Sequence, residues 1–153
     1  MKHLDRNIFN PDFVEFLQCL HSEFVESILV GGYAVVLHGY FRTTGDMDIW
    51  VRPSPKNYKR LQAAFARFGL PTEAISKAAF LDTANTDVFT FGRPPMAIDI
   101  LTTVKGLDFE ETFKMAESVN VDGAPLRLIH LNHLRQAKKA SDRNKDRDDL
   151  EHL

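Results

Sequence analysis

Two aspartates, Asp46 and Asp48, are separated by a single residue, and the residues that follow them are apolar. Side chains alternate between the two faces of a strand, so both carboxylates would project from one face while Met47 and Ile49 turn toward the core. A third aspartate, Asp99, lies between two isoleucines in a second apolar run. If the two strands are neighbours, the three carboxylates converge.

Three converging carboxylates repel one another unless a cation lies among them. Hard divalent ions such as Mg²⁺ take oxygen ligands and usually share their coordination with substrate phosphates. We therefore predict that Asp46, Asp48 and Asp99 are catalytic residues that bind Mg²⁺ or Mn²⁺ in phosphoryl or nucleotidyl transfer. The alternative is a solvated strand edge, which would be preferred if the Asp-x-Asp motif stood alone.

A glycine pair, Gly31-Gly32, follows a short apolar run and precedes the acids by the thirteen residues 33–45. Glycine permits close backbone approach, and free N–H groups at a helix start bind phosphate oxygens. We interpret the pair as part of a nucleotide site, against the alternative of a tight turn without a ligand. It is not a P-loop, because the G-x-x-x-x-G-K-[ST] order is absent.

The order of Gly31-Gly32, Asp46-x-Asp48 and Asp99 resembles the nucleotidyltransferase superfamily that includes DNA polymerase beta. Residues 29–49 and the tail 138–150 further resemble small bacterial nucleotidyltransferases related to abortive-infection toxins. The resemblance implies an α+β nucleotidyltransferase fold: a small mixed β-sheet with packed helices and two C-terminal helices. It also implies that Asp99, as the third acid, is the general base.

Basic and hydroxyl-bearing residues complete the predicted site. Arg42 and Thr44 precede the acids and are placed to contact a triphosphate, although loop arginines are often solvated. The charged tail has the alternative of a solvated, salt-bridged helix pair, but the resemblance favours a combined structural and nucleotide-binding role for its residues. In that tail, capping of a helix start explains Asp146 and Asp149. The predicted nucleotide-binding residues are Gly31, Gly32, Arg42, Thr44, Lys139, Arg143 and Lys145.

The resemblance implies transfer of a nucleoside monophosphate from a nucleoside triphosphate to a hydroxyl of RNA (notably tRNA), protein or a small molecule. It also implies a toxin–antitoxin or phage-defence setting, with an antitoxin as a partner. A non-catalytic nucleotide-binding or antitoxin-like protein is the alternative, and the presence of all three acids argues against it. A further alternative is an obligate subunit whose acceptor-binding part lies on a second chain. A haloacid-dehalogenase-type phosphatase is disfavoured, because Trp50 stands where those enzymes usually carry threonine or valine.

Length, composition and net charge limit the class of protein and the kinds of partner. The chain has 153 residues, of which 44% are hydrophobic and 26% charged, as expected for one globular domain over residues 1–153. A net charge of −2 argues against a nucleic-acid-coating protein. The single cysteine, Cys19, is predicted to be a buried thiol. Without a secretory leader pattern or a membrane-spanning apolar run, we expect a cytoplasmic location and no membrane partner.

Hydrophobic periodicity and turn residues predict the elements that position these groups. Asp122-Gly123 predicts a hairpin turn, residues 92–95 predict a second hairpin connection, and residues 70–86 show little pattern. Predicted helices cover residues 10–24, 33–38, 56–68, 109–118, 130–140 and 146–153. Predicted strands cover residues 27–30, 47–51, 87–91, 96–102, 119–121 and 124–129.

Overall fold

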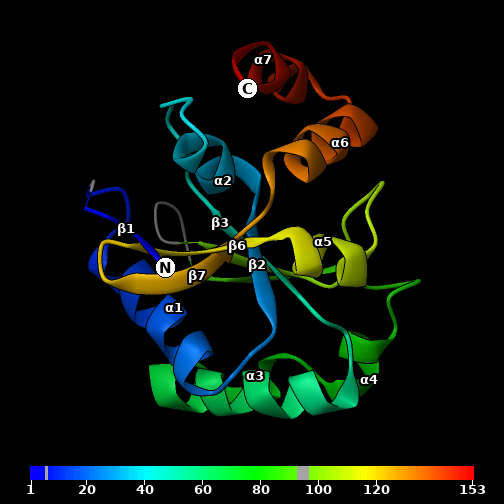
Figure 1. Cartoon of the computed structure of the whole chain (residues 1–153). Coiled ribbons are helices and arrows are strands. Elements are labelled where there is room, and N and C mark those ends of the chain that lie inside the picture. The colour runs from blue at the N-terminus through cyan, green and yellow to red at the C-terminus, as the bar shows by residue number, and fades with distance from the viewer. Residues whose placement is uncertain (6, 93–96) are drawn as a thin grey trace.

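The computed structural model describes residues 1–5, 7–92 and 97–153, in which one mixed sheet has the strand order β1-β6-β7-β2-β3-β5-β4 (Figure 1). The strands are β1 Lys2–Leu4, β2 Ser27–Val30, β3 Met47–Val51, β4 Val88–Phe91, β5 Ile98–Leu101, β6 Glu117–Val121 and β7 Ala124–Leu128. The helices are α1 Pro11–Ser22, α2 Gly31–Leu37, α3 Pro55–Phe68, α4 Lys77–Leu81, α5 Phe109–Met115, α6 Leu131–Ser141 and α7 Asn144–His152, with a 3₁₀ turn at Thr72–Ala74.

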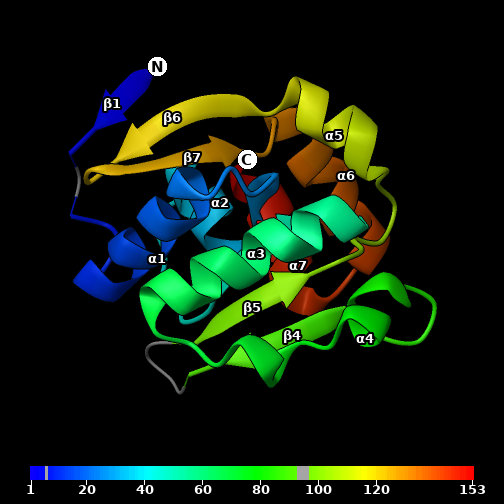
Figure 2. The ribbon, with the colours of Figure 1, turned by 90° about the horizontal axis from the view of Figure 1, so that it is seen from below.

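Helices cover the sheet on both sides. Figures 1 and 2 show α1 and α3 on one side, and α2, α6 and α7 on the other. The amphipathic α1 begins after the N-cap Asn10, and its buried Phe16 lies 6.2 Å, ring to ring, from Phe65 of α3. Cys19 is buried on α1, as predicted. Within the described residues, no helix combines the length and apolar character that a bilayer crossing requires.

Three central strands, β2, β3 and β5, carry the residues of interest. β2 runs antiparallel to β3 and pairs Val30 with Asp48, while β3 runs parallel to β5 and pairs Asp48 with Asp99. Met47 and Ile49, on the opposite face of β3, are buried in the core. The end of β2 and the starts of β3 and β5 therefore meet at one edge of the sheet, and Asp48 and Asp99 lie side by side there.

Two predictions about these elements were wrong. β3 covers Met47–Val51, as predicted, but Asp46 therefore lies in the preceding loop, and strand alternation does not orient its side chain with that of Asp48. The predicted helix 109–118 ends at Met115, and Glu117 opens β6 instead. Backbone pairing with β7 and β1 holds this polar segment in the sheet, and such long-range pairing leaves no local sequence signal.

Other predictions fared better. Asp122-Gly123 forms the turn between β6 and β7, and both residues have positive φ, as the tight hairpin requires. The mixed sheet and the two C-terminal helices confirm the predicted fold class, although the second helix begins at Asn144. The short β1 and α4 were not predicted. Most of the predicted connection 92–95, and the predicted strand start at Met96, lie outside the described residues.

Candidate active site

Two carboxylates, those of Asp48 and Asp99, form the centre of the site. They occupy paired positions on β3 and β5, and the Thr90 hydroxyl donates a hydrogen bond of 2.7 Å to Asp99 Oδ1. Burial raises the pKa of Asp48 to about 7, and the charge of Asp99, a hydrogen bond with it and the charge of Asp46 add to this rise. The pair is therefore stabilised by whatever supplies positive charge, whether a proton or a cation.

A polar cavity of about 570 Å³ opens beside this pair. It brings together all three predicted acids and six of the seven predicted nucleotide-binding residues. The exception is Lys139, which is exposed on α6 and is not among the described lining residues, whereas its neighbour Lys138 is. The lining comprises Gly31, Gly32, Arg42, Thr43, Thr44, Gly45, Asp46, Asp48, Asp99, Lys138, Arg143 and Lys145.

The three acids differ in how closely they approach one another. Asp48 and Asp99 are in hydrogen-bonding contact, while Asp46 is exposed on the preceding loop. Among the described residues, no three His, Cys, Asp or Glu side chains are grouped tightly enough to hold a metal ion together. The donor chemistry nevertheless suits a hard cation, because carboxylate oxygens are the ligands that Mg²⁺ and Mn²⁺ prefer.

Both glycines of the pair are required by close packing within the site. A Cβ at Gly31, whose φ is +71°, would lie 2.2 Å from Asp48 Oδ2. A Cβ at Gly32 would lie 2.2 Å from the Thr44 hydroxyl oxygen. Any larger residue would displace one of these side chains, so the pair permits Asp48 and Thr44 to reach their positions in the cavity.

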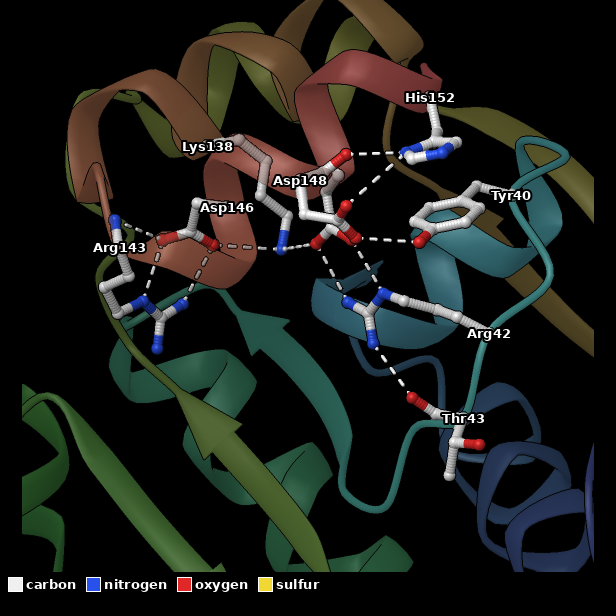
Figure 3. Close-up of polar contacts among 9 residues, drawn as sticks. Tyr40, Arg42, Thr43, Lys138, Arg143, Asp146, Asp148 and His152 are labelled. Carbon is white, nitrogen blue, oxygen red and sulfur yellow. Dashed lines mark hydrogen bonds and ion pairs between the residues drawn. The ribbon is translucent and has the colours of Figure 1, made fainter.

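A chain of alternating charges links the loop before Asp46 to α6 and α7 (Figure 3). Arg42 Nε and Nη2 donate to the two oxygens of Asp149 at 2.7 and 2.9 Å. Lys138 Nζ lies 2.9 Å from Asp149 and 3.3 Å from Asp146, and Arg143 Nε lies 2.8 Å from Asp146. Both aspartates are fully buried, so this network is a structural core of the site.

Each buried aspartate is kept ionised by its partners. Burial raises the pKa of Asp149, but hydrogen bonds from Arg42 and Lys138 outweigh it and hold the pKa below the ordinary value. Burial likewise raises the pKa of Asp146, and hydrogen bonds from Arg143 together with the charge of Lys138 reverse the direction. A buried carboxylate is tolerated only when charged or hydrogen-bonding partners surround it in this way.

Capping explains only part of the acidic tail. Asp146 does accept the Arg143 backbone N–H at 3.1 Å at the start of α7, as predicted. Asp149 lies inside α7 and pairs with Arg42 and Lys138 instead, so capping was the wrong explanation for it. The sequence analysis did not predict these ion pairs of Asp149 or the burial of Lys138. The i, i+3 spacing of Asp146 and Asp149 was the one signal for a shared environment, because it places both aspartates on one helix face.

A second contact holds α7 against the same loop. The Tyr40 hydroxyl donates a hydrogen bond of 2.7 Å to Asp148, and the Tyr40 ring stacks on His152 with centroids 4.0 Å apart (Figure 3). Together with the Arg42–Asp149 pair, these contacts fasten the segment that leads to Thr44 and Asp46 onto the last helix. Helix α7 therefore positions one wall of the polar cavity.

Comparison with known proteins bears on the fold. No protein-family model matches the sequence, and no curated protein matches it. A crystal structure of a candidate nucleotidyltransferase from Thermotoga maritima superposes with a TM-score of 0.58, over 94% of this chain and 93% of that one, at 14% sequence identity. The chain has a nucleotidyltransferase-like fold. At this level of identity the likeness concerns architecture alone.

In this nucleotidyltransferase-like fold, the cationic residues of the polar cavity differ in how fully their charges are paired with carboxylates of the protein. Arg42 is bound to Asp149 and to the Thr43 carbonyl, so it is a structural residue of the cavity wall. Arg143 pairs with Asp146, but its side chain is 59% exposed. Lys145 is exposed, and within the described part of the chain it forms no hydrogen bond or ion pair. Lys145 and Arg143 are thus the cations most accessible to an anionic ligand.

Asp48→Asn is expected to stabilise the metal-free protein above neutral pH. The ordinary pKa of 3.8 rises to about 7 in the folded state, so the wild type loses stability as pH rises between these values, and a neutral amide does not. We expect the variant's melting temperature to exceed the wild type's by several degrees at pH 8 in EDTA, and by less at pH 5, since about 1 kcal/mol moves it roughly 2–4 °C.

Calorimetric melting of both proteins at the two pH values measures this difference. Asp5→Asn serves as the control, because Asp5 is exposed and does not line the polar cavity that holds the Asp48–Asp99 pair. A gain that is equal at pH 5 and pH 8 would contradict the electrostatic account of the pair.

Proposed function

We propose that this chain is a metal-dependent nucleotidyltransferase that moves a nucleoside monophosphate from a nucleoside triphosphate to a hydroxyl acceptor. One observation carries the proposal: Asp48 and Asp99 lie side by side, on adjacent parallel strands, in a cavity that also holds Asp46 and the accessible cations Arg143 and Lys145. Carboxylates for a cation and cations for phosphate oxygens thus share one space. The nucleotidyltransferase-like fold supports the same reading.

The residues divide the work by their chemistry. Asp46, Asp48 and Asp99 would hold Mg²⁺ or Mn²⁺, which when bound neutralises phosphate charge and activates the α-phosphorus toward attack. Lys145 and Arg143 would bind the triphosphate oxygens through charge-assisted hydrogen bonds. Asp99 would accept the proton of the attacking hydroxyl, and the Thr90 hydrogen bond to Oδ1 orients its carboxylate for that role.

The acceptor and the biological setting stay predictions from the sequence. The likeness to toxin-related nucleotidyltransferases led us to expect RNA or protein as an acceptor and an antitoxin or second subunit as a partner. The fold likeness adds nothing to those expectations. A protein that binds the triphosphate without transferring it is the competing reading, and the tests below separate the two.

Binding of ATP is expected to require a divalent cation, because the carboxylates would otherwise repel the triphosphate. Isothermal calorimetry with MgCl₂, MnCl₂ or EDTA measures this directly. Lys145→Ala should weaken binding about 10–100-fold, the equivalent of losing a hydrogen bond to a charged group of about 1.5–3 kcal/mol. Lys59→Ala, at an exposed lysine of α3 on the other side of the sheet, is the matched control. Equal affinity with Mg²⁺ and with EDTA would refute the proposal.

A further inference from the structure

A second cavity, of about 530 Å³, lies against the same carboxylate pair. It shares five lining residues with the polar cavity: Gly31, Asp48, Asp99, Lys138 and Arg143. Its remaining walls come from the ends of β2 and β5, the segment after β5, the start of β4, Ile129 and helices α6 and α7, and more than half of these residues are apolar. These walls include Val88, Leu101, Val104, Leu134 and Ala137. The site is therefore two cavities of different polarity that meet at Asp48 and Asp99.

The geometry of phosphoryl chemistry assigns different ligands to the two cavities. In an in-line displacement at the α-phosphorus, the attacking oxygen and the leaving pyrophosphate lie on opposite sides of the phosphorus atom. If the pyrophosphate portion lies in the polar cavity with Lys145 and Arg143, the α-phosphorus lies near the shared carboxylates. The attacking hydroxyl must then approach from the opposite side. The second cavity, which Asp99 also lines and Lys145 does not, offers a space for that hydroxyl.

We propose that the second cavity is the acceptor site and that it takes a small hydroxyl-bearing molecule with an apolar face. This inference rests on the proposed function and names the acceptor class for it. The hydroxyl oxygen forms a bond to the α-phosphorus while the bond from that phosphorus to the bridging oxygen breaks. Pyrophosphate leaves with the bonding electron pair, and Asp99 takes the hydroxyl proton and returns it to water.

The size of the cavity favours a small molecule. Its volume of about 530 Å³ falls within the range of about 300–1,000 Å³ that is typical of small-molecule pockets. A single serine, threonine or tyrosine side chain of a protein acceptor would leave most of this space unfilled. An acceptor that contacts both Leu134 and Val88 must span the cavity from α6 to β4.

The charge of the cavity argues against an RNA end. Beyond the shared residues, its charged groups are Asp87, Lys105 and Asp146, and Asp146 is already paired with Lys138 and Arg143. These residues give no excess of positive charge, whereas binding of a nucleic-acid backbone depends on several cations. The apolar walls instead suit an uncharged ligand surface.

Filling the cavity tests the assignment. Ala137→Trp on α6 introduces an indole at a position that lines the second cavity and not the polar cavity. Thr103→Trp, in the segment after β5, does the same in case the first variant folds poorly. Asn132→Trp, at an exposed position of α6 that lines neither cavity, is the control. Each protein is incubated with Mg²⁺, α-labelled ATP and one of three cell-extract fractions: molecules below 1 kDa, RNA or protein.

The expected result is label transfer to the low-mass fraction that falls at least 100-fold in a cavity-filling variant, while the dissociation constant for MgATP changes less than threefold. Label found only in RNA or protein would overturn the inference. Full transfer by both cavity-filling variants, Ala137→Trp and Thr103→Trp, would overturn it as well. Intact MgATP binding without transfer to any fraction would also overturn it. Failure to bind any of the four common nucleoside triphosphates in Mg²⁺ would instead refute the proposed function itself, so the two failures are distinguishable.

Discussion

Asp99→Asn is expected to lower the rate of nucleotidyl transfer by about 10²–10⁴-fold, the usual cost of losing a general base. The amide cannot accept the proton of the attacking hydroxyl, whereas Asp48 still offers oxygen ligands to a phosphate-bound cation. The dissociation constant for MgATP should therefore change much less than the rate. The substitution is nearly isosteric and removes one of two adjacent charges, so the fold should persist.

The measurement is single-turnover label transfer beside calorimetric binding and thermal melting of the same preparations. Asp12→Asn, at an exposed aspartate in the first turn of α1 on the other side of the sheet, controls for a general loss of charge. Unchanged transfer in the Asp99 variant would remove this residue from the mechanism.

Asp149→Ala is expected to destabilise the fold by about 3–5 kcal/mol, because it leaves the buried Lys138 and the partly buried Arg42 without their shared partner. Lys138 would keep only the longer contact to Asp146, and Arg42 would lose both of its hydrogen bonds to a carboxylate. At roughly 2–4 °C per kcal/mol for a chain of this size, the melting temperature should fall by about 10 °C. The loop that carries Thr44 and Asp46 would keep only the Tyr40 contacts to α7.

Arg147→Ala is the matched control for this experiment. Arg147 also lies on α7 and pairs with Asp142 at 2.8 Å, but both side chains are more than half exposed. Solvent screens such a pair, so the control should melt close to the wild type. If the two variants melted at the same temperature, the buried network would not be the structural core of the site that its geometry indicates.

The parts of the site that sequence predicted are those with a local signature. Asp48 and Asp99 each lie in a short apolar strand, and their alternation with buried neighbours reveals the face on which they lie. Gly31 and Gly32 mark a close approach of the backbone to side chains, although the neighbours turned out to be Asp48 and Thr44. In each case the residue type and its immediate neighbours in the sequence are enough to predict that the residue belongs to the site.

The parts that sequence missed depend on contacts between distant segments. Nothing near Arg42 indicates that its partner is Asp149, 107 positions away in the chain. Lys138 resembles its exposed neighbour Lys139 in sequence, and only the docking of α7 on α6 buries one and not the other. Glu117 reads as helical, and strand pairing with β7 overrides that local preference.

The most direct test of the central claim is to compare ATP labelled at the α-phosphate with ATP labelled at the γ-phosphate. The wild type is incubated with each in Mg²⁺ and in EDTA, together with the three acceptor fractions. A nucleotidyltransferase transfers the α label, releases the γ label as pyrophosphate, and does neither in EDTA. Transfer of the γ label, transfer that persists in EDTA, or tight MgATP binding with no release of pyrophosphate would contradict the account.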